Sequence, residues 1–349
     1  MITPKKTRVL VVDDSIMFRT VLANRLGEDP MLEIVGTASD ADDAMKKIES
    51  LAPDVLTLDV EMPKMNGIQF LKKLMPIHPM PVVVVSSAPI SALDALDAGA
   101  VDFVKKPVVT NQNELNSFIR ELVVKIKIGS IAKIGKKAAV PTAGPEKRPA
   151  PVTLLRPVNN MIIAIGASTG GTEAILEVVR DLPATTPGVV IVQHMPAGFT
   201  KMYSERLDKH CKMRVKEAED GDRVVQGQII IGAGEFHLRL AKDAKGYYVT
   251  SKRGDKVSGH CPSVDVLFQS VSEVAKNRAV GVILTGMGAD GAKGLLAMRK
   301  AGAYTIGQDK ESCIVYGMPM VAYDIGGVVK QAPLTEIDNE IGRYLNGIR

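Results

Sequence analysis

The chain has 349 residues, with 44 Lys and Arg against 39 Asp and Glu and a formal net charge of +5. A composition of 46% hydrophobic and 24% charged residues is ordinary for a globular protein and excludes a disordered chain or a collagen-like fibre. At roughly 100–200 residues per domain, this length predicts two domains. The chain has no apolar run near about 18 residues and no stretch typical of a signal peptide. We therefore expect a cytoplasmic protein without membrane insertion, whose three scattered cysteines are reduced thiols.

The positive charge is concentrated in one segment. Residues 1–124 have 13 basic and 17 acidic side chains, residues 125–159 have 8 and 1, and residues 160–349 have 23 and 21. The middle segment is rich in proline and has no sustained periodicity after Gly129, so it predicts a partly extended linker. Because the surplus lies there, neither domain is expected to present a nucleic-acid-binding surface.

Short apolar runs alternate with amphipathic stretches over residues 8–127. The expected strands are Arg8–Val12, Leu32–Thr37, Val55–Leu58, Val82–Ser86 and Val101–Val104. Amphipathic stretches such as Ile16–Leu26 and Asp42–Ser50 separate them. Five such units predict a doubly wound parallel sheet with helices on both faces.

Polar side chains follow several of these strands, at the edge where ligands of such sheets bind. They are Asp13, Asp14, Asp59, Ser86 and Lys106. Three carboxylates at one edge repel one another unless a cation joins them, and Mg²⁺ prefers oxygen ligands. A lysine and a hydroxyl nearby suit a phosphoryl group. The alternative is an acidic, solvated sheet edge without a ligand.

The segments VVDDS, LDVEMPKMNG, VVVVSS and DFVKKP together resemble a response-regulator receiver domain, over about residues 6–125. The resemblance implies that Asp59 accepts the phosphoryl group. It also implies that Asp13, Asp14 and Asp59 hold Mg²⁺ with help from the carbonyl of Glu61, and that Lys106 contacts the phosphoryl group.

The same resemblance assigns a switch pair to Ser86 and Phe103. The hydroxyl of Ser86 is expected to move toward the phosphoryl group, and the ring of Phe103 to follow it inward. Phosphorylation is then expected to shift the population between two packings of the domain.

The second half begins with the apolar run at 161–165, the glycine-rich turn Gly166–Gly171 and a helical pattern over Thr172–Arg180. Three interpretations are open at this point. The turn is a phosphate-binding dinucleotide loop, a nucleophile turn that raises Ser168, or a turn that only lets helix and strand pack closely.

The next strand, Val189–Val192, separates these interpretations. A dinucleotide site expects an acidic residue about 20 positions on, whereas this strand ends in Gln193 and His194. Because a serine needs a base to act as a nucleophile near neutral pH, His194 favours the nucleophile turn. The alternative is a histidine that only caps a loop.

A third loop, residues 285–291, follows the apolar strand Ala279–Leu284 and precedes a helical pattern over Ala292–Lys300. Its glycines allow backbone N–H groups near a developing oxyanion, and Asp290 can orient His194. The alternative for Asp290 is an N-cap of the following helix. The chain order Ser, His, Asp differs from the order in α/β-hydrolases, so that fold is not implied.

Other candidates are weaker. His237 lies in the alternating stretch Glu235–Leu240 and is expected on a strand surface, while His260 either lines the cleft or belongs to the loop before the helical pattern Val264–Ala275. The segments Glu217–Gly227, Ile229–Ile231 and Tyr247–Thr250 suggest an antiparallel excursion at the sheet edge.

The segments IGASTGG, VQHMPAGF, SGHCPSVD and LTGMGADGAKG resemble the catalytic domain of the CheB family, the chemotaxis protein-glutamate methylesterases, from about Asn160 to Tyr344. The resemblance implies Ser168 as nucleophile, His194 as base and Asp290 as orienting acid. Backbone N–H groups of Met287 and Thr169 would form the oxyanion hole, and no cofactor or metal is needed for the esterase step.

Activity and partners also follow from the resemblance. It implies a phosphorylation-activated hydrolysis of glutamyl methyl esters on chemoreceptor cytoplasmic domains, deamidation of specific receptor glutamines, and a chemotaxis histidine kinase as phosphodonor. The expected organisation is α/β, with two doubly wound parallel-sheet domains. The receiver spans residues 6–125, the linker 126–159 and the methylesterase domain 160–349.

Two other functions remain as alternatives. A receiver-controlled transcriptional regulator is disfavoured because the second half lacks a short three-helix module. A nucleotide-binding oxidoreductase is disfavoured because no acid follows the second strand.

Overall fold

The computed structural model describes residues 5–87, 89–107, 111–133, 154, 158 and 160–348. The chain forms two compact units, Met1–Gly144 and Pro145–Arg349. Most of the expected linker lies outside the described residues. The three cysteines are free thiols, as predicted. Within the described part of the chain, no helix has both the length and the apolar character needed to cross a membrane.

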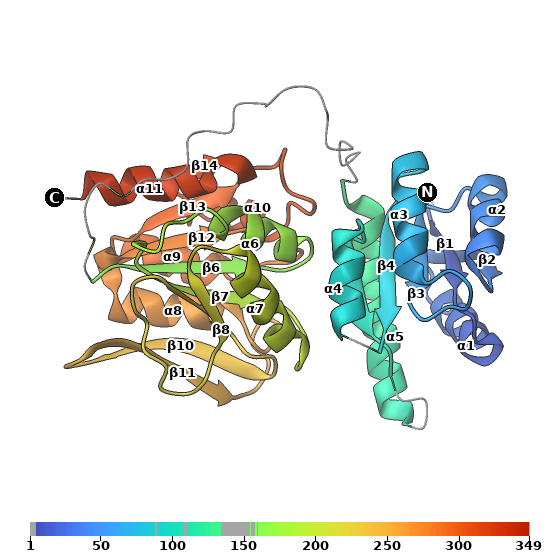
Figure 1. The fold of residues 1–349 in the computed structure, drawn as a ribbon, viewed down its shortest axis with the longest axis horizontal. Coiled ribbons are helices and arrows are strands. Elements are labelled where there is room, and N and C mark those ends of the chain that lie inside the picture. Colours follow the sequence, from blue (N-terminus) through green and yellow to red (C-terminus); the bar gives the residue numbers. More distant parts are fainter. Residues whose placement is uncertain are drawn as a thin grey trace. The chain divides into compact units, whose positions relative to one another are not determined.

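The first unit is built on a parallel sheet with the strand order β2-β1-β3-β4-β5 among its described residues (Figure 1). Its strands β1 to β5 are Thr7–Val12, Leu32–Ala38, Val55–Asp59, Val82–Ser86 and Asp102–Lys105. Strands β3 and β4 are buried throughout, as expected for runs of valine and leucine with helices on both faces.

Helices α1 to α5 of this unit are Ile16–Gly27, Ala41–Leu51, Gly67–Ile77, Pro89–Asp97 and Gln112–Ile131. Helices α1 and α5 share one core with the sheet, in which the rings of Phe18 and Phe118 lie 5.9 Å apart. Helices α2, α3 and α4 contact one another in sequence and cover the other face (Figure 1). Helix α5 continues beyond residue 125, where the linker was expected to begin.

The second unit has a longer parallel sheet, with the described strand order β14-β13-β12-β6-β7-β9-β8. These strands are β6 Ile162–Ala167, β7 Gly188–Gln193, β8 Arg214–Glu217, β9 Gln228–Ile231, β12 Ala279–Ile283, β13 Tyr304–Gln308 and β14 Lys330–Ala332. In the central register Ala167 pairs with Gln193 and Gly166 with Ile283. The loops that follow β6, β7 and β12 therefore meet at one edge of the sheet.

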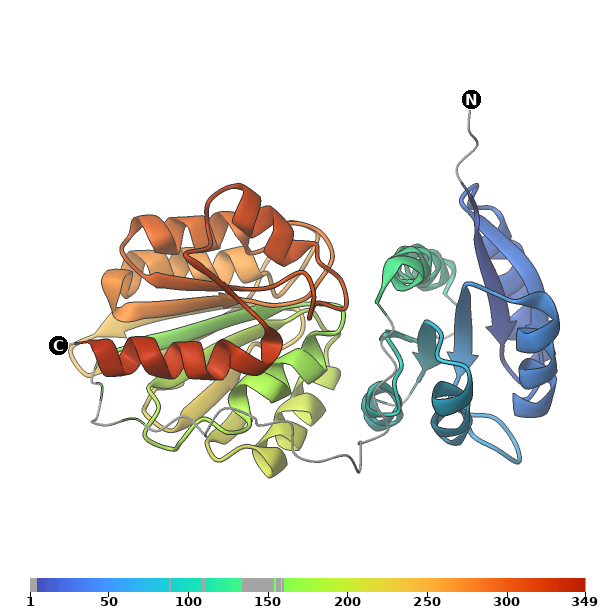
Figure 2. The same ribbon diagram turned by 90° about the horizontal axis from the view of Figure 1, so that it is seen from above.

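Helices cover both faces of this sheet (Figure 2). They are α6 Gly171–Val179, α7 Phe199–His210, α8 Val264–Val274, α9 Ala292–Lys300, α10 Met318–Asp324 and α11 Ile337–Gly347, with short 3₁₀ turns at Lys276–Arg278 and Leu334–Glu336. Helices α8, α9 and α10 enclose a core that includes Phe268, Leu295 and Met318. Helix α6 contacts α11, and α7 packs on β8.

The antiparallel excursion predicted at the sheet edge is only partly correct. Strands β10 (Phe236–Asp243) and β11 (Gly246–Arg253) do form an antiparallel pair, which packs on α8 through a hydrogen bond from Leu240 N–H to Ser270 Oγ of 2.9 Å. The run Ile229–Ile231 instead lies in β9, parallel to both β7 and β8. Its three isoleucines are fully buried, which is the pattern of a strand covered on both faces.

Candidate active site

The loop after β6 and the end of β7 hold Ser168 and His194 next to each other. The N–H of His194 donates to the carbonyl of Ala167 at 3.2 Å, which continues the β6–β7 pairing by one step. The N–H of Ser168 donates to the carbonyl of Thr285 at 3.0 Å and so ties the serine to the loop after β12. Ser168 itself is partly exposed, as a nucleophile that meets substrate must be.

His194 and Asp290 form a buried pair. Nε2 of His194 lies 2.8 Å from Oδ2 of Asp290, and the two side chains are 7% and 2% exposed. A carboxylate only accepts hydrogen bonds, so Nε2 bears the proton and Nδ1 retains its lone pair. Among the described atoms, Nδ1 is buried and has no hydrogen-bond partner. His194 is therefore held in one tautomer with a basic nitrogen to spare.

Asp290 occupies the N-terminus of α8 rather than that of α9. Its carboxylate accepts from the N–H groups of Val264 and Asp265 at 2.7 and 3.0 Å and from Ser263 Oγ at 2.7 Å. The N-cap of α9 is Gly291, so the alternative of an ordinary cap for the following helix is wrong. Burial alone raises the pKa of Asp290, but the hydrogen bonds from His194, Ser263 and Asp265 lower it overall and keep it ionised.

His260 lines the site, whereas His237 does not lie on a strand surface. The ring of His260 stacks on that of His194, with centroids 3.6 Å apart and an interplanar angle of 8°. His237 is 5% exposed. Its Nε2 lies 2.8 Å from the carbonyl of Asp255, and its Nδ1 accepts from the N–H of Ser263 at 3.3 Å. It therefore supports the loop before α8, and its side chain is buried because residues of that loop, Asp255 and Ser263, cover it.

The loop after β12 lies directly against the serine. A Cβ added at Gly286 would lie 2.7 Å from Cβ of Ser168, so this close approach requires glycine. Thr285 Oγ1 donates to the carbonyl of Thr169 at 3.0 Å. Thr169, which follows Ser168, is buried. Met287, which follows Gly286 in the other loop, is 43% exposed. The two expected oxyanion-hole residues thus adjoin this contact in the chain, Thr169 after Ser168 and Met287 after Gly286.

Sequence reasoning missed residues that support these loops. Gln308 accepts from the N–H of Thr285 at 2.8 Å, and the side chain of Gln193 donates to the carbonyl of Ser168 at 2.9 Å. Buried glutamines leave no periodic signal in a strand. Ser263 did carry a signal, because a serine before an apolar helical pattern is a typical N-cap.

A second cluster lies in the first unit. Carboxylate oxygens of Asp13, Asp14 and Asp59 lie within 4.8 Å of one another. Nζ of Lys106 lies 2.8 Å from Asp13 and 2.6 Å from Asp59, both nearly buried. Burial raises the pKa of Asp13, and the charge of Asp59 adds to the rise. The hydrogen bond from Lys106 lowers it, but by less. This crowding of hard oxygen ligands fits a Mg²⁺ ion, which would relieve the repulsion.

The expected switch residues lie beside this cluster. Ser86 ends β4 and is fully buried, and it pairs in register with Lys105, next to Lys106. Phe103 is 3% exposed. Its side chain is therefore buried in this structure, and the movement expected on phosphorylation stays a prediction. The N–H of Glu61 donates to Asp59 at 3.1 Å.

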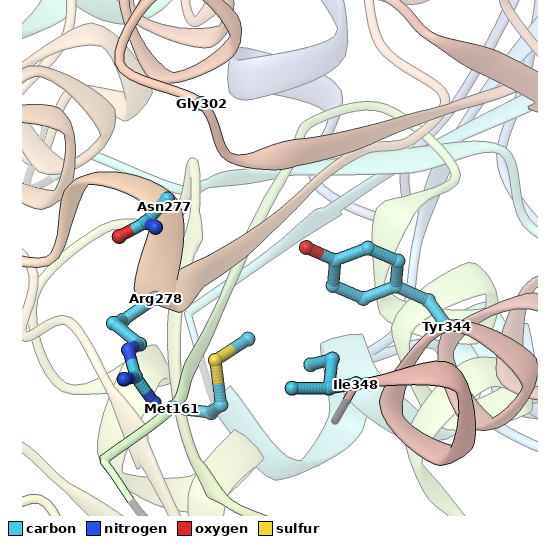
Figure 3. Close-up of a pocket in the computed structure, with 6 residues that line it drawn as sticks. All are labelled: Met161, Asn277, Arg278, Gly302, Tyr344 and Ile348. Carbon is cyan, nitrogen blue, oxygen red and sulfur yellow. The ribbon is translucent and has the colours of Figure 1, made fainter.

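A cavity of about 330 Å³ lies elsewhere in the second unit (Figure 3). Met161 precedes β6 and Arg278 precedes β12, so the cavity is at the amino edge of the strands, opposite the edge with Ser168. Its lining residues are Met161, Asn277, Arg278, Gly302, Tyr344 and Ile348. Its position separates it from the triad chemistry.

Comparisons with known proteins identify the family of each unit. Residues 163–341 match the CheB methylesterase family, and residues 9–120 match the response regulator receiver domain. The protein-glutamate methylesterase/protein-glutamine glutaminase 2 of Syntrophomonas wolfei is 52% identical over 342 residues, covering 98% of each chain. A protein-glutamate methylesterase/protein-glutamine glutaminase of Syntrophotalea carbinolica is 51% identical over 334 residues, covering 93% of each.

A solved structure extends the likeness to the fold. The CheB methylesterase catalytic domain of Thermotoga maritima is 37% identical, with a TM-score of 0.52, and the match covers 54% of this chain and 100% of that one. These matches place a methylesterase domain after the receiver and give no support to a transcriptional regulator. The chain therefore belongs to the CheB methylesterase family and has an N-terminal response regulator receiver domain.

Proposed function

We propose that this chain is a phosphorylation-activated esterase of chemotaxis. It hydrolyses glutamyl methyl esters on chemoreceptor cytoplasmic domains and deamidates specific receptor glutamines. Relatives that match nearly its whole length are named for both activities. The single observation that carries the proposal is the buried His194–Asp290 pair beside Ser168, with Nδ1 of His194 unpartnered among the described atoms.

The acylation step uses that nitrogen. Ser168 Oγ attacks the ester carbonyl carbon while His194 Nδ1 takes the hydroxyl proton, and the ionised Asp290 stabilises the imidazolium that forms. The carbonyl oxygen becomes an oxyanion, for which backbone N–H groups of Met287 and Thr169 are the proposed donors. Collapse of the intermediate breaks the bond to the methoxy oxygen, and the proton from Nδ1 leaves with it as methanol.

Deacylation repeats the cycle with water. His194 removes a proton from water, hydroxide attacks the acyl carbon, and Ser168 leaves with the proton returned by Nδ1, which releases a free glutamate. A receptor glutamine follows the same steps with ammonia as the leaving group. The stacked ring of His260 covers one face of His194 and limits its rotation during both proton transfers.

The receiver domain supplies the control. Asp13, Asp14 and Asp59 would hold Mg²⁺, which when bound neutralises charge on an incoming phosphoryl group. Asp59 is the proposed acceptor of that group from a chemotaxis histidine kinase, and Lys106, already within hydrogen-bond distance of Asp59, would pair with a phosphoryl oxygen. Ser86 and Phe103 are the proposed switch residues beside the acceptor.

The proposal is tested by measuring methanol release from methylated receptor membranes, with and without a small phosphodonor and Mg²⁺. We expect release by the native chain and an increase with the phosphodonor. A native chain that releases no methanol under either condition contradicts the proposal.

A further inference from the structure

The side chain of Gln193 connects the two residues that exchange the proton. Gln193 ends β7 directly before His194 and is 4% exposed. Its Nε2 donates to the carbonyl of Ser168 at 2.9 Å and to the carbonyl of His194 at 3.2 Å. One amide group therefore fixes the peptide planes that follow the serine and the histidine.

The other end of the amide is confined as well. Among the described atoms, Oε1 of Gln193 is buried and has no hydrogen-bond partner. A Cβ added at Gly171 would lie 2.1 Å from this oxygen, so the first residue of α6 leaves space that only glycine allows. An unpaired buried oxygen disfavours the folded state, and an aliphatic side chain of the same size would avoid that penalty. The amide at this position is thus explained by its two donated hydrogen bonds.

We propose that Gln193 is a positioning residue that sets the separation of Ser168 Oγ and His194 Nδ1. The carbonyl of Ser168 also accepts from the N–H of Gly171 at 2.7 Å, so the serine turn is held from both sides. Small displacements between reacting groups have large effects on rate. The kinetic part of this proposal depends on the proposed esterase function.

The kinetic test compares Gln193→Leu with the native full-length chain in methanol release. We expect kcat to fall about tenfold or more, with KM within about twofold, because the buried Gln193 side chain does not face the solvent from which substrate binds. The matched control is Tyr203→Phe, which removes a buried side-chain hydrogen bond to the carbonyl of Thr172 and leaves both hydrogen bonds donated by Gln193 in place. A kcat within about twofold of native for Gln193→Leu, or an equal loss in the control, overturns the proposal.

The conservative variant Gln193→Glu adds a pH signature. A protonated glutamate retains one donor, whereas an ionised one repels both carbonyls. We expect the ratio of variant to native kcat to fall as pH rises. A ratio that does not change with pH overturns the proposal.

A third measurement does not need esterase activity. The ring nitrogen resonances of His194, observed by ¹⁵N NMR, are expected to shift in Gln193→Leu and to remain unchanged in Tyr203→Phe. If the native chain releases no methanol, the proposed function fails, but this measurement still decides the role of Gln193. Unchanged His194 resonances in Gln193→Leu then overturn it.

Discussion

The orientation of the His194 ring decides which nitrogen does the chemistry. In proteases of the chymotrypsin type, Nδ1 faces the aspartate and Nε2 acts as the base. Here Nε2 faces Asp290, and Nδ1 is the nitrogen left for Ser168. In the triad that we propose, the three roles are the same but the two ring nitrogens of the histidine are exchanged.

The depressed pKa of Asp290 predicts a specific dependence of stability on pH. A carboxyl group whose folded pKa lies below its ordinary value of 3.8 stabilises the fold above that value, and the contribution is lost as pH falls through the folded pKa. We expect Asp290→Asn to lower the unfolding free energy by about 1–3 kcal/mol at neutral pH. The difference from the native chain should shrink on acidification below about pH 4, as measured by urea unfolding.

Asp265 provides the matched control for this experiment. Burial raises the pKa of Asp265, and the nearby charge of Asp290 raises it further. The hydrogen bond from the N–H of Gly294 opposes this rise but does not cancel it. The native fold thus loses stability as Asp265 ionises, so the stability of Asp265→Asn relative to native should increase with pH. A constant difference between Asp290→Asn and native across the acid range contradicts the role given to Asp290.

Single residues were predictable where chemistry and strand ends coincide. Ser168, His194 and Asp290 follow three apolar runs, and a parallel sheet brings such positions to one edge. The stacking of His260 and the inward placement of His237 were not predictable. Both depend on how the loop before α8 folds back onto the sheet edge, which no local periodicity encodes.

At the scale of elements, α8 joins the fold to the site. Ser263 is its N-cap, accepting from the N–H of Val266 while donating to Asp290. The first amides of α8 direct partial positive charge toward the carboxylate, which favours its ionised form. The N-terminus of α8 therefore holds the carboxylate of Asp290 in place with several hydrogen-bond donors.

Ser263→Ala tests this coupling. We expect a loss of about 1–2 kcal/mol in the unfolding free energy of the catalytic domain, because a cap is removed, together with a reduced kcat for methanol release. The matched control is Asn111→Ala, which removes the N-cap of α5 in the receiver domain. That variant should lose comparable stability in its own domain and retain the basal kcat. Equal effects of the two variants on kcat would mean that α8 has no special connection to the triad.

Buried parallel strands were predicted well because their short apolar runs contain no charged residue and polar residues or proline adjoin them, as in Val82–Ser86. Strand β4 and helix α9 coincide with the predicted ranges. Strand β9 was assigned to the wrong kind of pairing, since a run of three isoleucines fits a parallel or an antiparallel neighbour equally well. Its partner was decided by the crossover through α7 and β8.

At the scale of the whole molecule, one chain contains two candidate sites that depend on buried carboxylates. The receiver places three carboxylates and Lys106 at one sheet edge, and the second unit places Ser168, His194 and Asp290 at the corresponding edge of its own sheet. Both follow from parallel strands that end together. The domain order was predicted from the motifs of each half, and the surplus charge between them from the distribution of charged residues.

Asp59→Asn tests the link between these two sites. The amide cannot be phosphorylated, so we expect the phosphodonor-dependent increase in methanol release to disappear while basal release stays near native. Lys106 loses one carboxylate partner in this variant but retains Asp13 at 2.8 Å, which should preserve the receiver fold. Persistence of the full increase in Asp59→Asn would place the phosphorylation site elsewhere.

Methanol release by Ser168→Ala tests the central claim most directly. The substitution removes only the hydroxyl of a partly exposed residue, so folding and thermal stability should remain close to native. We predict that release from methylated receptor membranes falls to background with or without phosphodonor, while the native chain remains active. Release at the native rate by folded Ser168→Ala would contradict the assignment of this serine and of the triad built around it.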